Sequence, residues 1–393
     1  MMDKQEKKAE GSIFSELINS KRLLKNFMEA LKIISPSKNE LEINKFITEK
    51  FKKLGIVYYN DEAGKKIGGN CGNLTGFKKG NDRTKPPLFF SGHMDTVTVN
   101  GRIIPEIKND RIVNSDKTSI LGGDDRVAIA SLIEALEVIN ENNLKTGDIY
   151  LIFTVSEEIG LLGARYLNLK KIKAEYGFEL DGEGDVGTIF NIAPFQNTME
   201  FIISGKAAHA GIEPEKGINS IKAASGAISS LDTGRIDMET TCNIGIISGG
   251  TATNIVPENT KVKAEARSLT EKKLENITSV IKDAFENASS NAGAKLNSKI
   301  VREYNGFKIE ENEMPVKIAK EAIKRIGIVP KIAPTGGGSD INIFNAKGKR
   351  AVTLSAGMMN PHSNKEFVKI KELEKLSELI LEICSVNIER LKS

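Results

Sequence analysis

The sequence contains few cysteines, and none of them belongs to a metal-binding or disulfide pattern. The three cysteines, Cys71, Cys242 and Cys384, are far apart and form no CxxC pair. This spacing gives no support to a disulfide framework or to a cysteine-rich zinc site. Sparse cysteines are typical of proteins in a reducing compartment, so we expect a cytoplasmic protein.

Long apolar runs and basic tracts are also missing. No apolar run approaches the ~20 residues that a membrane-spanning helix needs, and residues 1–11 are polar, without the apolar core of a signal peptide. We expect those residues to form a disordered leader. The 56 basic and 52 acidic residues are dispersed, and no basic tract alternates with aromatic residues. We therefore expect neither a nucleic-acid partner nor a membrane partner.

The chain is long for one hydrophobic core, because 393 residues exceed the size at which single cores stop growing. Strand-like and helix-like segments of an α/β domain run through residues 12–193 and resume over 306–393. Between them, residues 194–305 follow the order β-α-β-β-α-β, which is typical of a ferredoxin-like unit. We therefore expect an α/β domain in two chain segments with an inserted α+β domain.

Two amphipathic helices are expected within residues 12–54, separated near Ser35-Pro36-Ser37. A serine followed three residues later by a glutamate is the capping-box pattern that begins many helices. Ser37 and Glu40 have this spacing. The pattern predicts that Ser37 caps the second helix, with Glu40 at the reciprocal position.

The pair His93 and Asp95 follows the apolar run 87–90, which predicts a short buried strand. Residues two apart in a strand point the same way, and open α/β sheets bind ligands at the carboxyl ends of their strands. A carboxylate that accepts the second ring N–H of a histidine makes the other nitrogen a better metal ligand. A buried histidine satisfied by a neighbouring aspartate would give the same pattern, so this pair alone leaves both interpretations open.

Further acids stand at the ends of predicted strands and at a predicted helix start. Asp124 and Asp125 follow two glycines where a helix begins, and an N-cap would require only one of them. Glu157 and Glu158 follow the apolar strand 148–155, and adjacent carboxylates repel unless a cation or a shared proton offsets them. A solvated turn is the alternative for this pair. Asp181 ends another predicted strand.

A set of two imidazoles and three carboxylates thus emerges: His93, Asp124, Glu158, Asp181 and His362. Mixed histidine and carboxylate ligands suit Zn²⁺ or another first-row ion, whereas Ca²⁺ and Mg²⁺ would not call for two histidines. Five ligands serve two ions if one carboxylate bridges them, ~3.5–4 Å apart, as in two-metal hydrolytic sites. We expect two divalent ions per chain, zinc first, with cobalt or manganese as alternatives.

Five motifs, taken in order, resemble those of the dinuclear-zinc exopeptidase and amidohydrolase family. They are Gly92-His93-Met94-Asp95-Thr96-Val97, Gly123-Asp124-Asp125, Ser156-Glu157-Glu158-Ile159-Gly160, Leu180-Asp181-Gly182 and Pro361-His362. The resemblance covers nearly the whole chain, and its Glu-Glu-Ile-Gly and Asp-Gly-Glu-Gly segments are most similar to the peptidase T branch. It implies a mixed sheet flanked by helices with an inserted lid, and a homodimer through that lid is a further expectation.

The resemblance also implies roles for the ligands. Carried over residue by residue, it makes Asp124 the bridging ligand between the two ions. His93 and Asp181 would complete one metal site, and Glu158 and His362 would complete the other.

Roles in catalysis follow from the same resemblance. Asp95 would be the partner of His93, and Glu157 would be the general base that activates a water. His209 matches the lid histidine that helps to hold the oxyanion; taken alone, it would be an ordinary surface histidine.

Four further residues match substrate-binding positions of the family. Asn254 and Arg267 match lid positions that contact the substrate carboxylate or backbone, although a lone lid arginine is usually a solvated charge. Gly336 and Gly337 lie in a glycine loop that resembles the substrate-binding loop, for which a flexible turn is the alternative.

The sequence departs from the family pattern beside these motifs. Gly123 and Arg126 flank the aspartate pair where the family often has alanine and lysine, and Ala210 follows His209 where peptidase T members commonly have proline. None of these changes removes a metal ligand, so the hydrolytic interpretation holds. The departures bear on the substrate instead.

Three functions are compatible with the resemblance. The first is a two-zinc aminopeptidase that hydrolyses the N-terminal residue of short peptides, tripeptides first, in the manner of peptidase T. The second is a carboxypeptidase or an N-acyl amino acid amidohydrolase. The third is a metal-dependent peptide-binding protein without catalysis, against which Glu157 argues, because a binding module needs no acid beside its metal ligands.

Overall fold

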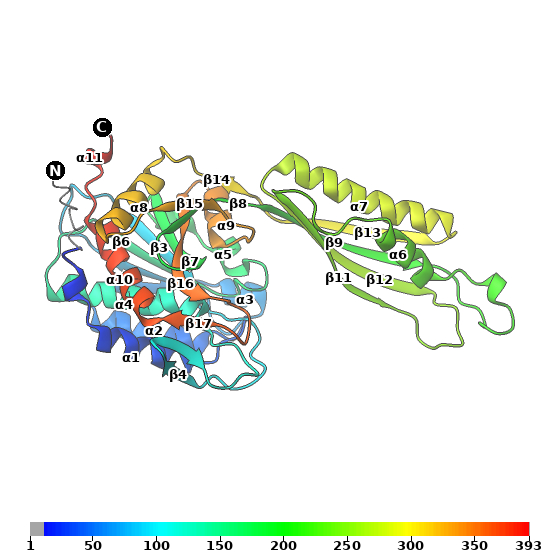
Figure 1. The fold of residues 1–393 in the computed structure, drawn as a ribbon, viewed down its shortest axis with the longest axis horizontal. Helices are drawn as coiled ribbons and strands as arrows, with labels where there is room; N and C mark the ends of the chain where they lie inside the picture. The colour runs from blue at the N-terminus through cyan, green and yellow to red at the C-terminus, as the bar shows by residue number, and fades with distance from the viewer. Residues whose placement is uncertain (1–11, 393) are drawn as a thin grey trace, which may run out of the picture. The chain divides into compact units, whose positions relative to one another are not determined.

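The computed structural model describes residues 12–392, which divide into two compact units (Figure 1). The larger unit comprises the chain up to Asn191 together with Ile309–Pro334 and the segment from Ser339 onward. The smaller unit comprises Ile192–Lys308 and Thr335–Gly338. The disordered leader predicted for residues 1–11 lies outside the described residues. Among the described residues, no helix is both long and apolar enough to span a bilayer.

The larger unit is built on a mixed sheet, which has 12 strands among the described residues. In sheet order its main path is β1 (Val57–Asn60), β2 (Leu74–Lys78), β6 (Ile149–Thr154), β3 (Leu88–His93), β7 (Tyr176–Glu183), β16 (Arg350–Met359), β17 (Phe367–Lys369), β5 (Arg111–Asn114) and β4 (Pro105–Lys108). Off this path, β8 (Thr188–Ala193) pairs with β16, and β14 (Phe307–Lys308) and β15 (Lys331–Pro334) pair with β8. The central strands β6, β3, β7 and β16 run parallel, so their carboxyl ends meet at one edge.

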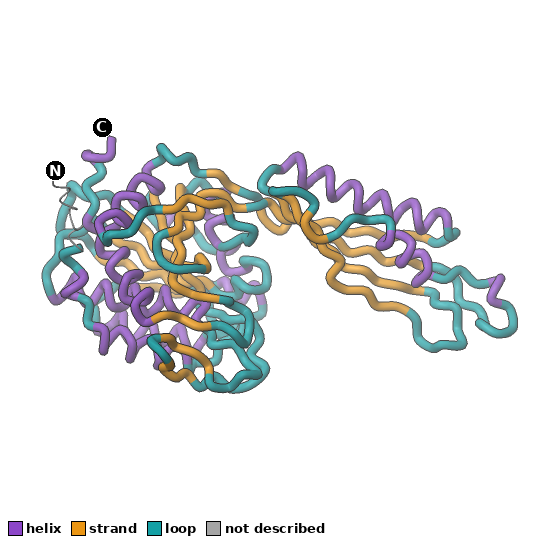
Figure 2. Tube along the Cα trace, in the orientation of Figure 1, coloured by secondary structure: helices purple, strands orange, loops and turns teal. Residues whose placement is uncertain are grey.

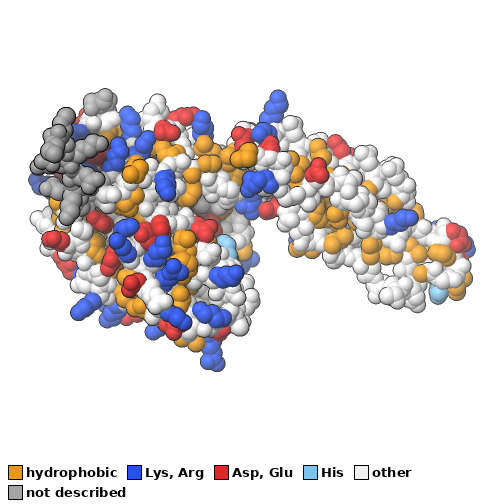
Figure 3. Space-filling model, in the orientation of Figure 1, with side chains coloured by type: hydrophobic (Ala, Val, Ile, Leu, Met, Phe, Trp, Pro, Cys, Tyr) orange, Lys and Arg blue, Asp and Glu red, His pale blue; other side chains and the backbone are white. Residues whose placement is uncertain are grey.

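Helices surround this sheet. They are α1 (Ser20–Leu31), α2 (Leu41–Lys53), α3 (Ala63–Ile67), α4 (Gly123–Glu141), α5 (Leu162–Tyr166), α8 (Met314–Arg325), α9 (Asp340–Ala346), α10 (Ile370–Ser385) and α11 (Glu389–Lys392), with 3₁₀ turns at Ser15–Leu17 and Leu169–Lys171. Helix α4 packs on β3, β7 and β16, and α1 and α10 pack on α4 (Figure 1). Figure 3 shows basic and acidic side chains intermixed on the face in view.

The apolar strand β3 explains why both faces of the sheet are covered. All six residues of β3 are buried, and neighbouring residues of a strand point to opposite faces. Phe89 packs against Phe344 of α9, with ring centroids 6.0 Å apart. On the other face, a Cβ at Gly92 would lie 2.8 Å from the Cβ of Ala128 in α4. Glycine at this position therefore lets α4 approach the strand closely.

The smaller unit is an antiparallel sheet covered by two helices. Its strands follow the order β10 (Gly234–Arg235), β11 (Thr240–Gly249), β12 (Asn259–Ser268), β9 (Phe195–Ser204) and β13 (Lys295–Tyr304). Helices α6 (Ser220–Ser229) and α7 (Glu271–Asn291) pack on each other and on these strands, and a 3₁₀ turn spans Pro214–Lys216. Figure 2 shows both helices along one side of the strands. The predicted fold class, including the inserted ferredoxin-like unit, is confirmed.

The core of the smaller unit lies between its sheet and its helices. Phe201 of β9 stacks on Phe285 of α7, with ring centroids 4.2 Å apart. Gly338 belongs to this unit because its backbone approaches the ring of Tyr304, where an added Cβ would lie 2.1 Å from the ring. The glycine loop is thus tied to the smaller unit by close backbone packing.

The predicted capping box at Ser37 is wrong. Helix α2 begins at Leu41, its N-cap residue is Glu40, and the Glu40 side chain does not cap it; the N–H of Leu41 donates to Oδ1 of Asn70 at 3.0 Å. The hydroxyl of Ser37 instead donates to Asp95, 58 residues away in the chain. Partners elsewhere in the fold have replaced the local pairing that the pattern predicted.

Candidate metal centre

The five predicted ligands come from separate segments of the larger unit and meet at one edge of its sheet. His93 ends β3, Asp181 lies in β7, Asp124 stands at the start of α4, Glu158 follows β6 and His362 follows β16. Because the central strands are parallel, the segments that follow them emerge side by side.

The carboxylate of Asp124 lies between the two imidazoles. Its Oδ1 is 2.9 Å from Nε2 of His93, and its Oδ2 is 3.0 Å from Nε2 of His362. Nε2 of His93 also lies 3.7 Å from Oδ1 of Asp181, and Nε2 of His362 lies 2.9 Å from Oε1 of Glu158. The five side chains therefore form two groups that share Asp124.

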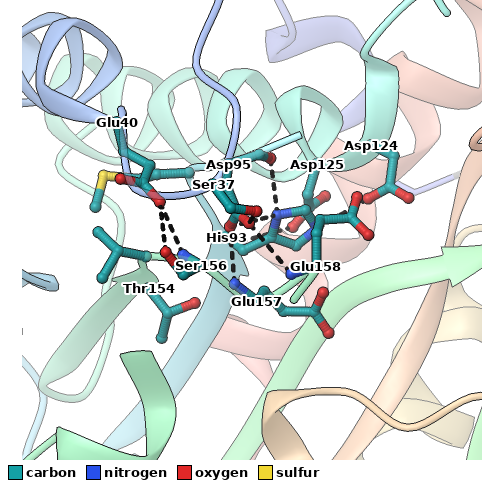
Figure 4. Close-up of polar contacts among 12 residues, drawn as sticks. Ser37, Glu40, His93, Asp95, Asp124, Asp125, Thr154, Ser156, Glu157 and Glu158 are labelled. Atoms are coloured by element: carbon teal, nitrogen blue, oxygen red, sulfur yellow. Dashed lines mark hydrogen bonds and ion pairs between the residues drawn. The ribbon is translucent and has the colours of Figure 1, made fainter. Parts of the chain in front are cut away.

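This donor set fits two first-row ions. Ligand atoms of His93, Asp124 and Glu158 lie within 4.8 Å of one another, as do those of His93, Asp125 and Asp181, and Figure 4 shows the first group gathered around one space. Tetrahedral ligands at metal distances of ~2.0–2.1 Å are separated by roughly 3.3 Å, close to the distances between these nitrogens and oxygens. Imidazole nitrogens and carboxylate oxygens are also the donors that zinc takes in hydrolytic sites.

The electrostatics show how strongly this cluster attracts positive charge. Burial opposes charge on His93, but hydrogen bonds to Asp124, Asp181 and Asp95 raise its pKa well above the ordinary value. Hydrogen bonds to Asp124 and Glu158 raise the pKa of His362 to about 10. In the metal-free chain these contacts favour the protonated form of both imidazoles, which places positive charge among the carboxylates.

The acids of the cluster respond in opposite directions. Burial disfavours charge on Asp124, yet the two imidazoles hold its pKa well below the ordinary range. Burial raises the pKa of Asp181 to about 7, with repulsion from Asp124 adding to the effect. Burial also raises the pKa of Glu158. Asp124 is thus the acid that keeps its charge most firmly, as a shared ligand must.

Asp125, the second acid of the pair, has a different environment. It is fully buried, its Oδ2 accepts the N–H of His93 at 3.2 Å, and its Oδ1 accepts that of Ala128 at 3.4 Å. The second contact is an N-cap at the start of the regular part of α4.

Asp95 organises the turn that carries Glu157 and Glu158. Its Oδ1 accepts the N–H of Glu157 at 2.9 Å, and its Oδ2 accepts the N–H of Glu158 at 3.2 Å (Figure 4). The nearest partner of His93 Nδ1 is the backbone oxygen of Asp95, at 3.0 Å, whereas the carboxylate lies at 3.5 Å. Asp95 therefore holds the imidazole mainly through its backbone and the glutamate pair through its side chain.

Glu157, the predicted general base, is a buried acid beside the predicted ligands. It is 8% exposed, and burial raises the pKa of its carboxyl well above the ordinary value, opposed by the charge on His93. A carboxyl with a raised pKa binds a proton more readily than an ordinary glutamate does.

A buried glutamate that the sequence patterns do not reveal holds the turn before Asp124. Glu366, four residues after His362, accepts four backbone N–H groups with its two carboxylate oxygens. Oε2 accepts from Leu121 and Gly122, both at 2.8 Å, and Oε1 accepts from Gly123 at 2.7 Å and Asp124 at 3.1 Å. No local pattern marks Glu366, because its partners lie more than 240 residues away.

A second buried hydrogen-bond network, which the sequence patterns also do not reveal, includes Asp340, whose charge acts on Glu157. Asp340 at the start of α9 accepts the hydroxyl of Thr154, while Glu179 accepts those of Ser339 and Thr353. Burial raises the pKa of Asp340 to about 7 and that of Glu179 to about 8. Burial therefore favours the protonated, neutral form of these two acids in the metal-free chain.

The remaining predicted residues belong to the smaller unit. His209 is exposed and pairs with Ile255 in an isolated β-bridge, and the N–H of Ala210 donates to the backbone oxygen of Asn254 at 3.0 Å. The fold thus brings His209 and Asn254 together from segments that are 45 positions apart in the printed sequence.

Arg267 and the glycine loop also meet in this unit. Both ends of the Arg267 guanidinium bond to Glu265, at 3.2 and 3.1 Å, and Nη1 lies 3.5 Å from the backbone oxygen of Gly336. Gly337 follows, with its N–H donating to the Thr335 hydroxyl at 3.1 Å. A carboxylate bound by Arg267 would therefore compete with, or extend, an existing ion pair.

A parallel sheet that gathers imidazoles and carboxylates at its carboxyl edge, with an inserted ferredoxin-like unit, defines a metal-dependent exopeptidase. Residues 196–292 match the family model described as a peptidase dimerisation domain of the M20 type, and residues 108–184 match M42 glutamyl aminopeptidase. The chain belongs to the M20 peptidase family, and it is a metallopeptidase.

Three relatives support this assignment over almost the full length of the chain. An uncharacterised Bacillus subtilis protein, YqjE, is 42% identical over 93% of this chain and 98% of its own length. The crystal structure of the aminopeptidase PepT from Bacillus cereus is 40% identical, with a TM-score of 0.85 over 96% of this chain and all of the other. A tripeptidase structure from Staphylococcus aureus is 37% identical, with a TM-score of 0.90 over 95% and 100% of the two chains.

Proposed function

We propose that the protein is a two-metal aminopeptidase that removes the N-terminal residue from short unblocked peptides, tripeptides first. The observation that carries this proposal is Asp124, whose two oxygens face two different imidazoles at 2.9 and 3.0 Å. The names of the similar structures, an aminopeptidase and a tripeptidase, support the substrate class. We further propose zinc as the metal, a homodimer through the smaller unit, and a cytoplasmic location.

In this proposal each residue of the cluster has a defined task. His93 and Asp181 would hold one ion, Glu158 and His362 would hold the other, and Asp124 would be shared by both sites. When bound, the two ions polarise the scissile carbonyl and lower the pKa of the attacking water toward ~7.

Glu157 takes the proton in this mechanism. Its carboxylate accepts a proton from the attacking water and then donates it to the nitrogen of the leaving amino group. The N–H of Glu157 donates to Oδ1 of Asp95 at 2.9 Å, which holds the backbone that carries this carboxylate. His209 is proposed as a donor to the oxyanion, and Asn254, Arg267, Gly336 and Gly337 as contacts to the rest of the peptide.

Recognition of a free amine requires a carboxylate, which the acidic segment after Asp181 supplies. Asp185 in this segment is paired with Lys369 at 2.6 Å. Glu183 accepts the N–H of Asn360 at 3.0 Å and is exposed. We therefore assign the amine contact to Glu183 in preference to Asp185.

The test compares substrates and one variant. Zinc-loaded protein should cleave free tripeptides faster than N-acetylated amino acids, and elemental analysis should find two ions per chain. Glu157→Gln should keep both ions and lose on the order of 10²–10⁴ in kcat, the usual contribution of a positioned base. Faster turnover of the N-acetylated substrates would replace the aminopeptidase with an amidohydrolase. Near wild-type turnover of Glu157→Gln would assign the base to another residue.

A further inference from the structure

The segment Ser35–Glu40, which joins α1 to α2, contacts both sides of the candidate active site. We call it the brace. Its first residue, Ser35, donates its hydroxyl to the backbone oxygen of Met94 at 2.9 Å and accepts the N–H of Thr96 at 3.0 Å. Farther along, Ser37 donates to Oδ2 of Asp95 at 2.6 Å. The brace therefore contacts three successive residues that follow His93: Met94, Asp95 and Thr96.

The last residue of the brace, Glu40, reaches the opposite side of the site. It is fully buried, and its Oε1 accepts the N–H of Ser156 at 2.9 Å and the hydroxyl of Ser156 at 3.0 Å (Figure 4). The same oxygen accepts the N–H of Lys38 at 2.7 Å. Glu40 thus ties the brace to the residue that immediately precedes Glu157.

The burial of the Glu40 carboxyl group is costly for the fold. Its second oxygen, Oε2, is buried and has no hydrogen-bond partner among the described residues. Burying an unpaired carboxylate oxygen is unfavourable, and an apolar side chain would avoid this cost. The hydrogen bonds from Ser156 to the other oxygen, Oε1, therefore explain a buried acid at this position better than its contribution to stability does.

Ser156, which donates to Oε1, has an unfavourable backbone conformation. Ser156 has φ +55°, in the left-handed region that residues other than glycine rarely adopt. This conformation turns the chain at the end of β6, so that the N–H groups of Glu157 and Glu158 both point at Asp95. Glu40 holds Ser156 by accepting both the backbone N–H and the hydroxyl of Ser156.

We propose that Glu40 is a positioning residue, which aims the Glu157 carboxylate by holding Ser156 in its left-handed conformation. The inference rests on the proposed role of Glu157 as the base. Glu40 must supply an acceptor oxygen on a side chain long enough to reach Ser156. Its charge is not required, because the three contacts of Oε1 are hydrogen bonds from neutral donors.

Two substitutions separate reach from charge. Glu40→Gln keeps an acceptor oxygen at the same reach and removes the charge. Glu40→Asp keeps the charge and withdraws the oxygen by one methylene. Because a misplacement of ~1 Å in an active site can cost about 10²-fold, Glu40→Asp should lower kcat by roughly 10–100-fold. Glu40→Gln should stay close to wild type.

The measurements are made on the full zinc-loaded chain with a free tripeptide. For Glu40→Asp the fall should be in kcat, with KM near wild type and two zinc ions still bound. The control is Glu382→Asp, which shortens another buried glutamate of the same unit, whose partners are the hydroxyls of Ser12 and Ser385 and the guanidinium of Arg325. The control should leave kcat unchanged.

A second readout requires neither metal nor turnover. Hydrogen exchange of the peptide that spans 154–160 should be faster in metal-free Glu40→Asp than in wild type, and unchanged in Glu40→Gln and in the control. This readout separates the two proposals, because it tests the hold on Ser156 even if Glu157→Gln shows that the base lies elsewhere.

Two results would overturn the inference. The first is wild-type kcat and wild-type exchange in Glu40→Asp, which would show that the hold on Ser156 is dispensable. The second is an equal loss in Glu40→Gln and Glu40→Asp, which would show that the charge of Glu40 acts instead of its reach.

Discussion

Replacing Glu366 by glutamine should weaken metal binding although Glu366 is not itself a proposed ligand. Its two oxygens accept two backbone N–H groups each. An amide offers one acceptor oxygen and one NH₂ donor. Whichever way the amide of Glu366→Gln is turned, two backbone N–H groups lose their acceptor and face another donor.

The magnitude follows from the number of donors left without a partner. Each buried donor that loses its acceptor costs ~1–3 kcal/mol, so two cost about 2–6 kcal/mol. One of the four donors is the N–H of Asp124 itself. The loop that carries the bridging carboxylate should therefore move, and zinc affinity should fall by about 10–100-fold, as for other supporting groups around metal sites.

The assay is competition for zinc with a chelator, run at pH 8. Burial raises the pKa of Glu366 to about 7, so the wild-type carboxylate is ionised at that pH. Glu382→Gln is the control, because Glu382 is equally buried and accepts from the hydroxyls of Ser12 and Ser385, which can rotate to suit an amide. It also loses the charge of an ion pair, with Arg325 at 3.6 Å, so it controls for the removal of a buried charge away from the candidate site. Equal zinc affinities for Glu366→Gln and wild type would refute the reasoning.

Two further predictions concern pH and the substrate. The pKa of His362 is raised from 6.5 to about 10 in the metal-free chain, so its contribution to stability is complete below about pH 6.5 and is lost as pH rises toward 10. Because zinc must displace that proton, affinity measured by chelator competition should rise between pH 6.5 and 8.5, and a flat profile would contradict this. Arg267→Ala should raise KM for tripeptides with both metals retained, since the side chain already binds one carboxylate, that of Glu265. An unchanged KM would remove Arg267 from substrate binding.

The ligand set could be proposed from the sequence because histidines and carboxylates stand at or near the ends of predicted strands. His93 is the last residue of the buried strand β3, and Asp181 lies in β7. In a parallel arrangement these ends meet at one edge, so ligands that are distant in sequence become neighbours. That step needs only the fold class, which the order of strands and helices predicted.

The supporting residues could not be found in this way. Ser37 and Glu40 have the spacing of a capping box, and the pattern assigned them to a local pairing. In the structure their partners are Asp95, 58 residues away, and Ser156, 116 residues away. A pattern of nearby residues carries no information about such distant partners. Contacts formed only in the folded chain determine which groups Ser37 and Glu40 bind.

The buried acids around the centre argue for cations on grounds that are independent of any motif. They are Asp95, Asp124, Asp125, Glu157, Glu179, Asp340 and Glu366, each at most 8% exposed. Nearby positive charge in the chain comes from His93, His362 and Arg126, and burial lowers the pKa of Arg126 to about 10. Burying so many acids in their ionised form is unfavourable unless positive charge offsets them, and in the metal-free chain burial shifts the pKa values of Glu179, Asp340 and Glu366 upward instead. Two divalent ions held by Asp124 and its neighbours would supply four positive charges at the point where these acids converge, which is why the fold can retain them.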